Sequence, residues 1–68
     1  MLVLIDSDTK QLIGKFVDEQ IARIAGRMLS QETRRPLTLA LTEAARIPVA
    51  RYRDGKEIQH SATIHYLE

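Results

Sequence analysis

The chain contains no cysteine, tryptophan or asparagine among its 68 residues. Without cysteine, disulfides and thiolate metal sites are excluded, and two histidines remain as the nitrogen ligands. A chain this short is commonly stabilised by a disulfide, a metal or a partner. Its stability is therefore expected to come from well-ordered packing or from self-association.

Glycine is scarce as well, and its three positions exclude a phosphate-binding glycine-rich loop. No nucleophile elbow and no metal-ligating helix motif is present. His60 and His65 are five residues apart, which places them on opposite faces of a strand, so they cannot share a metal within one chain. We expect no catalytic residue, metal or cofactor, and any active site in so small a domain would lie between subunits.

Long apolar runs are also missing, which argues against a membrane-spanning helix. The apolar start, residues 1–5, is too short for a signal-peptide core and has no basic leader, which predicts a cytoplasmic protein without membrane contact. The last two residues, Leu67 and Glu68, match the junction left by histidine-tag vectors. We therefore expect one small domain over residues 1–66 and treat 67–68 as a tag remnant.

Charge is nearly balanced overall, at +1, but it is unevenly distributed. Residues 23–56 hold eight basic and three acidic side chains, a net charge of +5, whereas each flank carries −2. A solvated surface with charges paired between segments is the simpler interpretation, and an anion-binding patch is the alternative.

The apolar pattern predicts an α+β domain of two layers, with a mainly antiparallel sheet packed against one amphipathic helix. A short apolar run predicts a buried strand over 1–6. Residues 9–30 have helical spacing, with Asp8 and Gln11 as a capping box and the helix ending near 30. An alternative pairs a strand over 11–17 with the first strand through a turn at 7–10, and starts the helix near Asp18. The apolar positions of this segment are Leu12, Ile13, Phe16, Val17, Ile21, Ile24, Ala25 and Met28.

The segment 31–46 fits two structures. Alternation of leucine with threonine and alanine favours a strand over 37–42, although a helix beginning at Pro36 also fits. Pro48 then stands at the start of the next strand, where its missing N–H is tolerated.

Asp54-Gly55 predicts a type I′ turn between strands 47–53 and 56–66, since both residues tolerate positive φ. Centring the hairpin there pairs Arg53 with Lys56 and Val49 with His60. In this register the apolar face carries Ile47, Val49, Ile58, Ala62 and Ile64, and Arg51 and His60 lie at its edge. The polar face carries Ala50, Tyr52, Glu57, Gln59, Ser61, Thr63 and His65.

Two functions follow from these observations. The first is a non-catalytic interaction or assembly module that forms a homodimer, because small sheets leave open edges. The second is a nucleic-acid-binding regulator that uses the basic middle segment, residues 34–56. The candidate binding residues are Arg34, Arg35, Arg46, Arg51, Arg53, Lys56 and His60.

Overall fold

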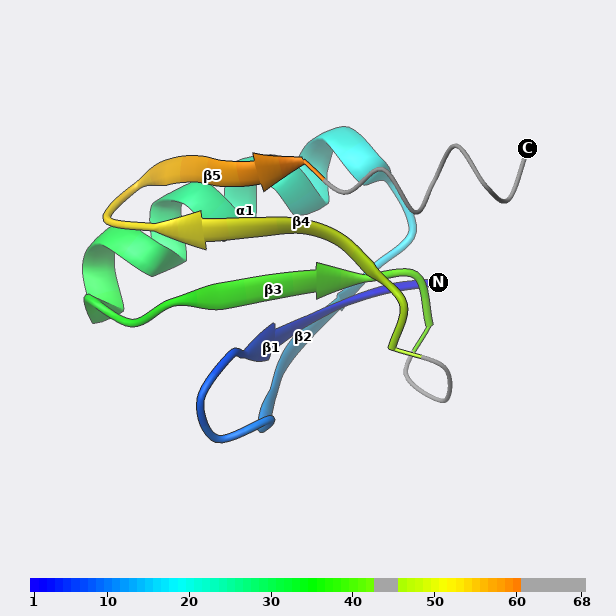
Figure 1. Ribbon diagram of the computed structural model, residues 1–68. Coiled ribbons are helices and arrows are strands. Elements are labelled where there is room, and N and C mark those ends of the chain that lie inside the picture. Colours follow the sequence, from blue (N-terminus) through cyan, green and yellow to red (C-terminus); the bar gives the residue numbers. More distant parts are fainter. Residues whose placement is uncertain (43–45, 61–68) are drawn as a thin grey trace.

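The computed structural model describes residues 1–42 and 46–60, with Gln59 and His60 described by their backbone alone. The elements in chain order are β1 (Leu2–Asp6), β2 (Leu12–Phe16), α1 (Glu19–Thr33), β3 (Leu37–Ala40), β4 (Pro48–Arg53) and β5 (Lys56–His60). The strands form one antiparallel sheet in the order β2-β1-β3-β4-β5, with α1 packed across one face (Figure 1). The expected α+β architecture is confirmed.

The prediction of a long helix over 9–30 is wrong, and the alternative with a second strand is correct. Leu12–Phe16 pairs with β1, with Gly14 opposite Leu4. Asp6, not Asp8, organises the connection, since its carboxylate accepts the backbone N–H groups of Asp8 and Thr9. The apolar residues of this stretch fit the spacing of a helix and that of a strand, and pairing with the buried strand β1 makes it a strand.

Asp18 begins α1. Its carboxylate accepts the N–H groups of Gln20 and Ile21, which the first turn of a helix leaves without helical partners. The helix continues to Thr33, a little beyond the expected end near 30, and stops at Arg34, whose φ of 57° is left-handed. Its face toward the sheet buries Ala22, Gly26 and Ser30.

A strand follows the helix, as the leucine alternation predicts. β3 covers Leu37–Ala40, shorter than the expected 37–42, and Pro48 is the first residue of β4. Residues 43–45 of the segment 31–46 lie outside the described residues. So do the expected strand residues 61–66 and the tag remnant 67–68.

The β4–β5 hairpin turns at Asp54 and Gly55, whose φ values of 53° and 82° confirm the type I′ turn. The expected register holds only at the tip, where Arg53 pairs with Lys56 and Tyr52 with Glu57. A bulge beyond Tyr52 shifts the register, so Arg51 pairs with Gln59 rather than Ile58.

Tyr52 was assigned to the polar face of this hairpin, and that assignment is wrong. Its side chain is fully buried in the core, whereas Ile58, expected on the apolar face, is exposed. The periodicity of an isolated hairpin shows which residues share a face, but not which face α1 covers.

The core has two parts because β1 is buried on both faces. Between sheet and helix lie Leu2, Leu4, Ala22, Leu37, Leu39, Val49, Ala50 and Tyr52. A smaller cluster of Val3, Ile5 and Ala40 forms separately, with Leu12 packed against it. Burial on both faces explains the continuous apolar run at the start of the chain. Each fully buried leucine contributes about 1.5–3 kcal/mol through removal of apolar surface from water.

Candidate functional site

The seven residues proposed for binding do not form one surface. Arg34 ends α1, and Arg46 donates through Nη1 to the carbonyl of Lys10 at 3.0 Å. His60 pairs through its backbone with Ala50, one position out of the expected register with Val49. The fold therefore disperses the basic stretch of the sequence, and Arg35 and Arg46 make contacts that connect distant segments of the chain.

Arg35 is an example of this structural use. Its Nε donates to Oδ2 of Asp6, and its Nη2 lies 3.3 Å from Oδ1 of the same carboxylate. The hydrogen bond from Arg35, together with the N–H groups of Thr9 and Asp8, holds the pKa of Asp6 well below its usual range. This group of contacts joins the β1–β2 connection to the start of β3.

Arg51, Arg53 and Lys56 do share a face. Arg51 and Arg53 alternate with the buried Tyr52 along β4, so both point away from α1. Lys56 lies directly across the hairpin from Arg53. Neither arginine has an ion-pair partner among the described residues. Three of the expected residues therefore form a basic strip on the exposed face of the sheet.

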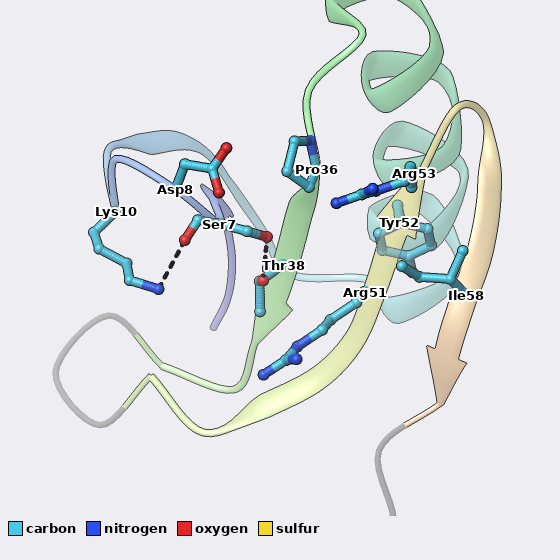
Figure 2. A pocket seen from close by; sticks show the side chains of 9 residues that line it. All are labelled: Ser7, Asp8, Lys10, Pro36, Thr38, Arg51, Tyr52, Arg53 and Ile58. Atoms are coloured by element: carbon cyan, nitrogen blue, oxygen red, sulfur yellow. Dashed lines mark hydrogen bonds between the residues drawn. The ribbon is translucent and has the colours of Figure 1, made fainter.

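A concavity of about 230 Å³ extends from this strip to the β1–β2 connection. Its polar and basic lining is formed by Ser7, Lys10, Thr38, Arg51 and Arg53. Figure 2 shows Arg53 extending from β4 toward Pro36 and Arg51 extending from β4 on the side of Thr38, with Ser7 and Lys10 beyond β3. The antiparallel pairing of β1 with β3 and of β3 with β4 brings these distant segments together.

Hydrogen bonds fix the far side of the concavity. The hydroxyls of Ser7 and Thr38 are 2.7 Å apart, and Lys10 Nζ donates to the carbonyl of Ser7 at 2.8 Å (Figure 2). Asp8 is the acidic residue of this lining, and one of its carboxylate oxygens is 4.0 Å from Arg35 Nη2. Sequence reasoning missed Ser7, Lys10 and Thr38 because no local motif marks them.

A second surface, the apolar flank, consists of Val17, Ile21, Ile24 and Met28. These side chains are 87%, 58%, 48% and 59% exposed, although the sequence assigned them to the buried face of a helix. The opposite flank of α1 contacts β5 and the β4–β5 turn, through Arg23 and Ser30. At 100° per residue, Ile21, Ile24 and Met28 lie within about 60° of one another, on the side of α1 that faces away from the buried Ala22, Gly26 and Ser30.

Between α1 and β5, Arg23 donates to Glu57 at 2.7 Å and to Glu19 at 3.2 Å. The ring of Tyr52 is buried beneath these charges, and its hydroxyl has no hydrogen-bond partner in the described part of the chain. Burial, and next the charge of Glu57, raises the pKa of Tyr52 to about 12. This region is built as a structural contact between helix and sheet.

The described residues contain no group of three or more metal-binding side chains. Within residues 1–42 and 46–60, α1 is neither long nor apolar enough to cross a membrane. Comparison of the chain with family models, curated proteins and solved structures gives no significant match. Function is therefore argued from the concavity and the apolar flank.

Proposed function

We propose that this chain is a non-catalytic assembly module that forms a homodimer through the apolar flank and the neighbouring edge of β2. The observation that supports it most is the exposure of four large aliphatic side chains, three on one side of α1 and the fourth, Val17, just before its N-terminus. Scattered exposed aliphatic residues are normal, whereas adjacent ones indicate an interaction surface.

The strand beside this flank also favours a partner. Among the described residues β2 pairs only with β1, so one side of its backbone is open. Ile13, within β2, is 43% exposed, and β2 contains no proline. An open strand with exposed aliphatic neighbours is a template for strand pairing.

A second copy is the occupant that fits both features. Antiparallel pairing of two β2 strands around a two-fold axis satisfies the open backbone groups of both copies at once. The same rotation places both copies of α1 on the same face of the joined sheet, so that the two apolar flanks belong to one continuous surface. Such a contact extends a core that one 68-residue chain builds alone.

Light scattering across a concentration range tests this proposal. Ile21→Glu and Met28→Glu place a charge on the apolar flank without touching the buried core, so each variant is expected to be monomeric where the natural chain is dimeric. Gln20→Glu adds the same charge at an exposed position nearby on α1 and is expected to remain dimeric. A natural chain that is monomeric at millimolar concentration rejects the proposal.

Nucleic-acid binding is the second candidate, narrowed from seven residues to the strip of Arg51, Arg53 and Lys56. The shared exposed face of these residues favours it. The described residues provide no aromatic platform, because Tyr52 is buried and Phe16 packs against the helix-side core, and this argues against it. Fluorescence titration with mixed-sequence DNA and RNA at low salt decides the matter, and absence of binding there removes this candidate.

A further inference from the structure

We propose that the concavity between β4 and the β1–β2 connection binds a phosphate monoester group. This inference does not depend on dimer formation, because the concavity lies on the face of the sheet opposite α1. It shares Arg51 and Arg53 with the nucleic-acid candidate but requires a single phosphate instead of a strand.

Three cations converge on this site from separate segments. Arg51 and Arg53 come from β4, and Lys10 comes from the β1–β2 connection. The described residues offer neither arginine an acidic partner, while the lining acid Asp8 is directed to Arg35 at 4.0 Å. A cluster of unneutralised cations in a concave surface raises the local concentration of anions.

The donors on the far side of the concavity, those of Lys10, Ser7 and Thr38, are held in place before any ligand arrives. Lys10 has a left-handed backbone, with φ of 66°, and its ammonium group is anchored by one bond to the Ser7 carbonyl, which leaves two N–H donors. The Ser7 and Thr38 hydroxyls share one hydrogen bond, so the pair retains a second hydroxyl hydrogen to donate. Preorganised donors reduce the entropy that binding loses.

Charge and size favour a phosphate monoester. This group carries a charge near −2 at neutral pH and three acceptor oxygens, which suit two guanidinium forks and an ammonium group. A volume of about 230 Å³ accommodates one such group with a small organic substituent. Bases of a single strand would lack a stacking surface here, since the described residues place no aromatic ring on this face.

The test is an NMR titration of the ¹⁵N-labelled chain with inorganic phosphate, matched by sodium chloride at equal ionic strength. With phosphate, we expect saturable chemical-shift changes at the backbone amides of Ser7, Thr38, Arg51 and Arg53. With chloride, we expect none at these amides. Shifts of equal size with both salts, or phosphate shifts spread over α1, overturn the proposal.

Variants connect the binding to these side chains. Arg51→Gln and Arg53→Gln are each expected to weaken phosphate binding about tenfold or more, because each removes charge-assisted hydrogen bonds. Arg27→Gln makes the same charge change on α1, across the sheet, and is expected to bind as the natural chain does. Arg51 and Arg53 are exposed, so their substitution leaves the core intact. NMR spectra of the backbone amides without ligand establish that each variant is folded. Equal weakening in Arg27→Gln overturns the site.

Two further ligands identify the source of the phosphate. Methyl phosphate is expected to bind as inorganic phosphate does, and dimethyl phosphate about tenfold more weakly because it carries one charge. A short oligonucleotide is expected to bind only when it carries a 5′-phosphate. Binding that grows with oligonucleotide length and ignores the 5′-phosphate overturns the single-phosphate site in favour of a strand-binding surface.

Discussion

Gly26 of α1 and Tyr52 of β4 approach so closely that no other residue fits at the glycine. A Cβ added to Gly26 would lie 2.5 Å from Cε2 and 2.9 Å from Cζ of the tyrosine ring. The absence of one side chain on the helix makes room for the largest side chain of the core. This contact sets how near α1 lies to the sheet.

Gly26→Ala is expected to destabilise the fold by about 1–3 kcal/mol, because overpacking outweighs the helix propensity that alanine gains. Urea unfolding measures the change. Combining Gly26→Ala with Tyr52→Leu provides the control, since a smaller side chain at 52 relieves the contact. Additive effects of the two substitutions would contradict a direct clash.

Deprotonation of the buried Tyr52 phenol is expected to lower the free energy of unfolding at high pH. Its pKa is about 12 in the fold and about 10 in an unfolded chain, so folding favours the neutral phenol. That contribution is complete below pH 10 and is lost as the pH rises toward 12. Unfolding measured from pH 9 to 11.5 should show a steeper decline in the natural chain than in Tyr52→Phe. Identical pH profiles would show that this phenol is not protected.

Ser30 connects α1 to the tip of the β4–β5 hairpin. Its hydroxyl donates to the Arg27 carbonyl at 3.0 Å and accepts the N–H of Gly55 at 3.0 Å. Ser30→Ala is expected to cost about 1–3 kcal/mol in unfolding free energy, because the Gly55 donor loses its partner. Thr33→Ala is the control, since the exposed Thr33 hydroxyl donates back to the Leu29 carbonyl within the same helix. Equal losses for both would contradict this role of Ser30.

Protonation of the Asp6 carboxylate is expected to lower the free energy of unfolding at low pH. Its folded pKa lies below that of an unfolded aspartate, near 3.9, so its contribution is complete above that value and is lost as the pH falls below it. Asp6→Asn is expected to lower stability at pH 7 and to flatten the decline between pH 4 and 2. Asp8→Asn, at an exposed carboxylate, should leave the decline in place. The check is urea unfolding at several pH values, and an unchanged decline in Asp6→Asn would contradict the assignment.

Much of the fold can be predicted from local sequence because its signals are short-range. The apolar run of β1, the leucine alternation of β3 and the Asp54-Gly55 turn each indicate an element that the structure contains. Residues 9–17 could not be assigned to helix or strand from the spacing of apolar residues alone, and the structure forms a strand over 12–16. Their strand depends on pairing with β1, which local sequence does not encode.

The candidate site was less predictable for the same reason. Counting basic residues selected three arginines with structural contacts and two that line the concavity. Arg34 caps α1, Arg35 pairs with the Asp6 carboxylate and Arg46 donates to a backbone carbonyl, whereas Arg51 and Arg53 line the concavity. Lys10 and Thr38 reach the concavity through strand order. The apolar flank resembled a buried helix face because its spacing is the same, and only the position of α1 over the sheet shows its exposure.

The assembly module is tested most directly by cysteine cross-linking, for which a chain without native cysteine is well suited. Val17→Cys and Ile24→Cys place thiols on the apolar flank, and Lys56→Cys and Arg27→Cys place them on exposed positions outside it. Under mild oxidation, a homodimer through the β2 edge predicts disulfide-linked dimers from the first pair at concentrations where the second pair stays monomeric. Equal cross-linking at all four positions, or none at the flank, would contradict the proposed interface.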